Sequence, residues 1–109
     1  MFCSNLTYPI SHRPEDVYWN MRHNQMEYLY GDIMVRGYYP GYALRYYDEH
    51  NIHINFYPGD EEALKEGTVD FVSLSYYYSR LSGEEPYLHS ELGQVPNPDI
   101  PASDWGWGT

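Results

Sequence analysis

The sequence has few positive charges, one cysteine and no long hydrophobic run. Six lysines and arginines stand against sixteen carboxylates, which gives 109 residues a formal net charge of −10. A chain of this charge does not neutralise phosphates, which argues against a nucleic-acid partner. Its single lysine, Lys65, makes no polybasic patch for a membrane surface. The mean hydropathy is −0.68, and no apolar stretch approaches the roughly 20 residues of a membrane span.

The lone cysteine and the first residues predict a cytoplasmic protein. Cys3 has no second cysteine with which to form an internal disulfide, and disulfides are a feature of oxidising compartments. The first residues lack the charged segment and apolar core of a secretory signal. Aromatic side chains, by contrast, are abundant: they make up 18% of the chain and include fourteen tyrosines. The length suits one small domain.

Helix signals begin at Pro14, which is well placed as a first helical residue. Glu15 and Asp16 follow in the first turn, where the positive end of the helix dipole favours acidic side chains. Apolar residues then recur with helical spacing, so we predict a helix over about 14–30. Gly31 is its expected end.

Turn residues separate this helix from three further segments. Pro40 predicts the start of a second helix, which runs to about His50. Residues 51–57 alternate apolar and polar side chains, as in a short half-buried strand or an extended segment. Asp60 is expected to be the N-cap of a short helix that ends at Gly67.

The most strand-like segment is Thr68–Tyr78, which is rich in β-branched and aromatic residues. It follows a helix directly, which predicts a helix-then-strand unit of a parallel α/β sheet, with a short strand in 1–10. Residues 81–109 show no periodicity, and their four prolines predict a long irregular loop. Loops of that length are usually functional or belong to something larger.

Alternation along Thr68–Tyr78 places Ser75 and Tyr77 on one face, which becomes more polar toward the carboxyl end. The opposite face is apolar, with Leu74 and Tyr76 on it, and is expected to pack under helices. Because α/β folds place ligand sites at the carboxyl ends of their strands, Ser75 and Tyr77 are the site candidates from pattern alone. The alternative is that Tyr77 is an ordinary core tyrosine with a satisfied hydroxyl.

The other reactive side chains form no recognisable catalytic set. Glu84 and Glu85 are adjacent, and side chains of adjacent residues diverge in an extended loop, so a solvated charge pair is expected. The five histidines show no metal-ligand spacing with carboxylates or the cysteine. No glycine-rich phosphate loop follows a strand, and we predict neither a cofactor nor a metal. Trp105 and Trp107 are suited to stacking on a sugar, although buried packing is the commoner use of tryptophan.

The run VDFVSLSYYYSR (Val69–Arg80) resembles the sixth-strand signature of glycoside hydrolase family 1. Ser75 stands where most of that family has Asn, as it does in the bacterial 6-phospho-β-glucosidase branch. Asn97–Gly108 is similar to the branch's Asn-Pro-x-x-x-Ala-Ser-Glu-Trp-Gly-Trp segment. Tyr8–Val17 resembles the tail of strand five with the start of its helix, and Val35–Tyr47 resembles the branch's Val-Arg-Gly-x-Tyr-Pro stretch. Order and spacing match over essentially the whole chain.

The resemblance implies an α/β fold: a fragment of a (β/α)8 TIM barrel with the end of strand five, its helices, strand six and the loop 81–109. Residues 1–109 would then be one incomplete domain. The implied function is a retaining glycosidase that hydrolyses 6-phospho-β-glucosides. That family's acid/base lies in an Asn-Glu motif and its nucleophile in a Glu-Asn-Gly motif, and the chain contains neither. Both catalytic glutamates are thus expected outside the chain, which would be inactive alone.

Three residues carry over to the implied site. Tyr77 matches the family tyrosine that hydrogen-bonds the nucleophilic carboxylate and so stabilises its anionic form. Ser75 would line the same pocket, and Trp105 lies near the border of the aglycone side. The implied partners are a phosphorylated β-glucoside and, at open strand edges, complementary fragments or a second copy. The alternative fold is a compact α+β domain, and the alternative function is a non-catalytic Tyr/Trp-rich binding module or an inactive remnant.

Overall fold

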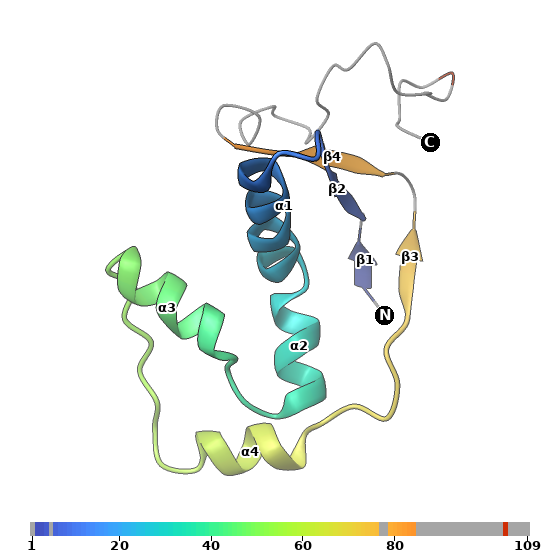
Figure 1. The fold of residues 1–109 in the computed structure, drawn as a ribbon. Coiled ribbons are helices and arrows are strands. Elements are labelled where there is room, and N and C mark those ends of the chain that lie inside the picture. The colour runs from blue at the N-terminus through green and yellow to red at the C-terminus, as the bar shows by residue number, and fades with distance from the viewer. Residues whose placement is uncertain (1, 5, 77–78, 85–103, 105–109) are drawn as a thin grey trace. The chain divides into compact units, whose positions relative to one another are not determined.

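The computed structural model describes residues 2–4, 6–76, 79–84 and 104 (Figure 1). The chain divides into two compact units, the strand unit of 1–24 with 74–109 and the helical unit of 25–73. No helix within the described residues is long and apolar enough to cross a membrane. In chain order the elements are β1 (Phe2–Ser4), β2 (Thr7–Pro9), α1 (Pro14–Glu27), α2 (Leu29–Arg36), α3 (Gly41–Glu49), α4 (Asp60–Glu66), β3 (Leu74–Tyr76) and β4 (Arg80–Ser82).

The strand unit holds two pairs of parallel strands. β1 pairs with β3, where Phe2 lies opposite Leu74, and β2 pairs with β4, where Thr7 lies opposite Arg80. Parallel neighbours need a long crossover connection, and here that connection carries all four helices. The predicted parallel α/β arrangement is therefore confirmed, with the segment near the N-terminus as the partner of the strand-like segment.

The predicted strand over 68–78 is shorter than expected in its first half. The described strand begins only at Leu74, and residues 68–73 are not in a strand. A strand needs a neighbour to satisfy its backbone groups. Val69 finds one elsewhere, since its N–H donates to the carbonyl of Met34 at 3.1 Å.

The first predicted helix ends at a different residue. α1 stops at Glu27, and α2 continues through Gly31 to Arg36, so the expectation that Gly31 ends the helix was wrong. Leu29 and Ile33 share one face of α2 and are 4% and 8% exposed. Their burial is worth more than the roughly 1 kcal/mol that a helical glycine costs.

The actual end of α2 is Gly37, which adopts a left-handed φ of 74°. Its N–H donates to the Ile33 carbonyl at 2.8 Å, as is usual where glycine ends a helix. A Cβ at this position would lie 3.0 Å from both the Leu64 carbonyl oxygen and Lys65 Cα. The close approach of α4 to the end of α2 thus also favours glycine.

The two later helices agree with the prediction apart from one cap. α3 begins directly after Pro40, and α4 ends at Gly67. The N-cap of α4 is Gly59, whereas Asp60 was predicted; Asp60 is the first helical residue, and its carboxylate accepts the Tyr57 N–H at 2.8 Å. Residues 51–57 are exposed and lie outside helices and strands, so the half-buried strand expected there was wrong.

The helical unit has a small core. Its buried apolar residues are Leu29, Ile33 and Ala43. Five partly buried side chains pack against them: Met26, Tyr39, Tyr42, Tyr47 and Leu64. Many large apolar side chains are exposed, among them Phe71, Tyr30 and Tyr57. Apolar exposure on this scale is typical of surfaces that pack against another part of a protein.

Candidate functional site

Ser75 is the one predicted site residue that the structure describes. It lies at the centre of β3 opposite Cys3 of β1 and is half-buried, whereas its neighbours Leu74 and Tyr76 are 44% and 50% exposed. The alternation of faces is thus present over these three residues. The apolar face was expected to pack under helices, and it is instead exposed to solvent in this chain.

Tyr77 and Trp105, the other two predicted site residues, lie outside the described residues, as do Trp107 and Glu85. Their predicted roles stay predictions. Almost all of the predicted loop over 81–109 also lies there, although its first two residues belong to β4.

Strand register limits how far the alternation extends. Paired residues of β1 and β3 differ by 72 in residue number, and paired residues of β2 and β4 differ by 73. The connection from β3 to β4 is therefore one residue longer than the connection from β1 to β2. A one-residue change of register exchanges the two faces of a strand, so the face assigned at Ser75 does not carry over to Leu81.

Two loops meet beyond the carboxyl ends of β2 and β4. The ladder continues one step past the strands, since the Ile10 N–H donates to the Ser82 carbonyl at 2.9 Å. Ser11 follows β2, and Glu84 follows β4. Both reach the first turn of α1, where the Ser11 hydroxyl and the Glu84 N–H (3.1 Å) donate to the two carboxylate oxygens of Asp16.

Asp16 is 4% exposed, which is unusual for an acid in the first turn of a helix. The Ser11 hydroxyl, then the Glu84 N–H, and finally the charge of Arg13 hold the pKa of Asp16 below its ordinary value, against the opposing effect of burial. Hydrogen bonds to a carboxylate favour its ionised form. Asp16 is therefore suited to accept hydrogen bonds at neutral pH and not to donate a proton to a substrate.

One face of α1 bonds to both strands. Asp16, Asn20 and Asn24 are spaced by four residues and so share a helix face. The Ser82 hydroxyl donates to the Asn20 side-chain oxygen at 2.8 Å, and the Asn24 side-chain amide donates to the Thr7 carbonyl at 3.0 Å. Ser82 is only 2% exposed. The sequence analysis missed this polar face, although its spacing is visible in the sequence.

Gly83 allows the two loops to come this close. A Cβ on Gly83 would lie 2.7 Å from the Asp16 carboxylate and 2.7 Å from Ile10 Cγ2. Real side chains essentially never approach so closely, so a larger residue would push the loop away from α1.

Glu84 contributes its backbone to this arrangement, while its side chain is exposed. The Glu84 carboxylate lies 3.6 Å from the Arg13 guanidinium, and both side chains are at least half exposed. Surface ion pairs of this kind contribute little free energy. This placement agrees with the prediction of a solvated charge and gives Glu84 no partner for acid–base chemistry among the described residues.

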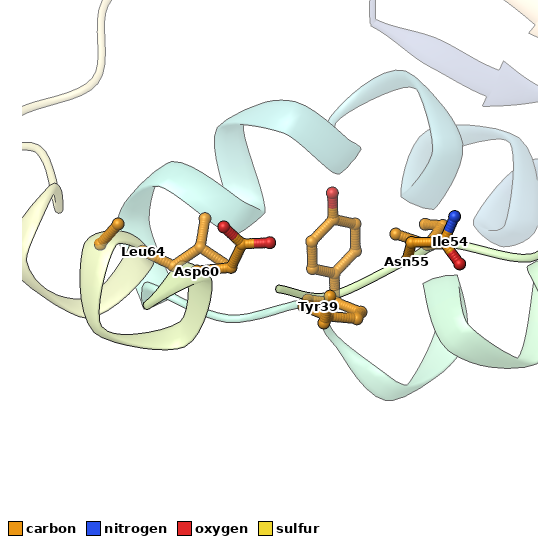
Figure 2. Close-up of a pocket in the computed structure, with 7 residues that line it drawn as sticks. Tyr39, Ile54, Asn55, Asp60 and Leu64 are labelled. Atoms are coloured by element: carbon orange, nitrogen blue, oxygen red, sulfur yellow. The ribbon is translucent and has the colours of Figure 1, made fainter. Parts of the chain in front are cut away.

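The helical unit contains a separate hollow of about 300 Å³ (Figure 2). Within it the rings of Tyr39 and Phe56 meet edge to face, with centroids 5.5 Å apart. Asp60 is the lone carboxylate there, and it is already bonded to the Tyr57 N–H. The full lining is Tyr39, Ile54, Asn55, Phe56, Asp60, Ala63 and Leu64. None of the predicted site residues is among them, and no three potential metal ligands gather anywhere in the described part of the chain.

Comparison with known proteins places the whole chain in one family. Residues 1–109 match the model of Glycosyl hydrolase family 1. Over 112 residues the chain is 41% identical to the aryl-phospho-β-D-glucosidase BglH of Bacillus subtilis and 38% identical to the phospho-cellobiase of Klebsiella oxytoca. These matches cover 98% of this chain and 24% of each relative. Among solved structures, the family 1 β-glucosidase from Thermotoga maritima matches with a TM-score of 0.67 and 25% identity, over 99% of this chain and 23% of that one.

Proposed function

The chain belongs to glycosyl hydrolase family 1, and from this membership we propose that it forms part of a retaining 6-phospho-β-glucosidase. The observation that carries the proposal is the set of similar relatives: proteins 37–41% identical over at least 92% of this chain are named as phospho-β-glucosidases or a phospho-cellobiase. The paired strands and intervening helices are a fragment of the family's (β/α)8 barrel.

Retaining hydrolysis needs a nucleophilic carboxylate and an acid/base about 5–5.5 Å apart across the scissile bond. The chain contains neither glutamate motif of the family. We therefore propose that both glutamates come from other strands of the barrel and that the chain is inactive alone. Its own contribution is one wall of the site at the carboxyl ends of strands five and six.

Within that wall we assign roles to three residues. The Tyr77 hydroxyl donates a hydrogen bond to the nucleophile, which stabilises the carboxylate as the anion that attacks the sugar. Ser75 lines the same pocket, and Trp105 borders the aglycone side. The half-buried position of Ser75 at the centre of β3 supports its assignment. The family resemblance supports the other two.

The proposed ligand and surroundings follow from the same chemistry. A phosphorylated β-glucoside is charged, and a bilayer opposes the passage of charge, so the enzyme would meet it in the cytoplasm. Residues 1–109 form one incomplete domain in this proposal. Its open strand edges and exposed apolar side chains would be covered by the complementary part of the barrel or, without it, by a second copy.

A graft tests the proposal. The chain replaces the matching segment of BglH from Bacillus subtilis, and we call the product the grafted barrel. We expect it to hydrolyse an aryl 6-phospho-β-glucoside with retention of configuration. Tyr77→Phe should lower kcat/KM about tenfold or more, because a hydrogen bond to a charged group is worth about 1.5–3 kcal/mol.

The matched control is Tyr57→Phe, the same change at an exposed tyrosine of the helical unit, which should leave kcat/KM unchanged. A grafted barrel that folds but does not hydrolyse the substrate would contradict the proposed function. Equal kcat/KM values for Tyr77→Phe and Tyr57→Phe would contradict the role of Tyr77 alone.

A further inference from the structure

The proposed reaction assigns no role to the buried carboxylate of Asp16. Asp16 is 4% exposed and joins three parts of the strand unit: its own helix α1, the loop after β2 through the Ser11 hydroxyl, and the loop after β4 through the Glu84 N–H. Both loops leave the carboxyl ends of neighbouring parallel strands. In (β/α)8 enzymes the substrate is bound at that end of the barrel.

We propose that Asp16 is a positioning residue, which holds the start of the loop after β4 against α1 and so sets the geometry of the substrate-binding end of the barrel. This inference rests on the proposed function. Asp16 does not touch the substrate in it. Its effect on the reaction passes through the backbone of Gly83 and Glu84.

The chemistry of the contact favours a carboxylate. The Ser11 hydroxyl and the Glu84 N–H donate hydrogen bonds to different carboxylate oxygens of Asp16. Asparagine has one acceptor oxygen and an NH₂ group in place of the other. With its NH₂ turned to a rotated Ser11 hydroxyl, an asparagine would still accept the Glu84 N–H, but as a neutral group. A hydrogen bond to a neutral acceptor is about half as strong as one to a carboxylate. Glutamate would need room for one more methylene at a contact that already excludes a Cβ on Gly83.

A simpler role for Asp16 would be to stabilise the helix dipole. That role needs only an acidic side chain in the first turn of α1, and the exposed Glu15 already provides one. It does not require burial, a loop 68 residues away in the sequence, or a glycine at the point of contact. These three features distinguish loop positioning from dipole stabilisation.

The test is Asp16→Asn in the grafted barrel, with two readouts. We expect kcat to fall about tenfold with KM changed less than threefold, because small displacements of site groups reduce the rate strongly. Residue-resolved hydrogen exchange should show the Glu84 amide exchanging at least tenfold faster. The Arg80 amide, which donates to the Leu6 carbonyl at 2.8 Å within the strand ladder, should keep its protection.

Two further variants serve as controls. Asp60→Asn makes the same change at an aspartate that also accepts a backbone N–H, but in the helical unit, and it should leave kcat and both amides unchanged. Ser11→Ala removes one donor and leaves the Glu84 contact intact, so kcat should stay within threefold of the parent.

The outcomes separate the possible failures. An Asp16→Asn variant with unchanged kcat and unchanged Glu84 exchange would overturn the inference. Faster exchange at Arg80 as well as Glu84 would also overturn it, because Asp16 would then support the fold in general. If the unsubstituted grafted barrel is inactive, the proposed function fails, and the comparison of Glu84 with Arg80 still decides whether Asp16 positions the loop.

Discussion

Gly37 and Gly41 should respond with opposite signs to the same substitution by alanine. Gly37 has a φ of 74°, and a Cβ there would lie 3.0 Å from the Leu64 carbonyl oxygen. The left-handed conformation costs an alanine about 1–2 kcal/mol, and crowding in a packed contact typically costs about 1–3 kcal/mol. Alanine also restricts the unfolded chain more than glycine does, which offsets about 0.4–1 kcal/mol of this destabilisation. Together these contributions lead us to expect that Gly37→Ala destabilises the helical unit by about 1–4.5 kcal/mol.

Gly41 is the first residue of α3, its φ is not positive, and nothing lies within 4 Å of a Cβ built there. Alanine should therefore stabilise the protein at Gly41 by about 0.5–1 kcal/mol through helix propensity and the unfolded state. Urea unfolding of the two variants in the grafted barrel, followed by circular dichroism, measures both effects. Equal stabilities for Gly37→Ala and the parent would refute the described end of α2, and destabilisation by Gly41→Ala would refute the open space described at the start of α3.

Two further predictions concern the core and the pH dependence of the helical unit. Leu29→Ala removes a buried side chain and should cost about 2–5 kcal/mol in urea unfolding, whereas Leu44→Ala, at a side chain that is 48% exposed, should cost less than half as much. Burial and then the hydrogen bond to Asp32 raise the pKa of Tyr42 to about 12. The unfolded tyrosine ionises near pH 10, so this contribution to stability is complete below pH 10 and is lost as the pH rises to 12. A Tyr42→Phe variant should not show that component of the loss, and identical pH profiles for it and the parent would contradict the assignment.

The arrangement of the elements was predictable because local signals and chain order agree. A β-branched and aromatic segment directly after a helix indicates a parallel sheet, and the structure pairs that segment with the residues near the N-terminus. The strand boundaries were not predictable in this way. They depend on which residues of the two strands lie opposite one another. Only the structure shows that Phe2 lies opposite Leu74.

The end of the first helical region shows how packing outweighs a local preference. Gly31 is a helix breaker by composition, yet the helix passes through it because Leu29 and Ile33 on either side become buried. Gly37 has the same composition-based signal and does end the helix. The difference is the close approach of Leu64 in α4, which sequence periodicity does not contain.

Asp16 illustrates the same limit at the candidate site. Its position two residues after Pro14 predicted a first-turn acid, and such residues are normally solvated. Its two donors come from five residues before it and sixty-eight residues after it. The four-residue spacing of Asp16, Asn20 and Asn24 was available as a signal for a polar helix face, but only the tertiary structure shows what that face bonds.

The most direct test of the whole account compares the isolated 109-residue chain with the grafted barrel on one aryl 6-phospho-β-glucoside. The account predicts no measurable hydrolysis by the rigorously purified chain, because it contains neither glutamate motif of the family, and hydrolysis with retention by the grafted barrel. Turnover by the isolated chain that is abolished by Glu84→Gln would contradict it. That result would place the catalytic carboxylate within this chain.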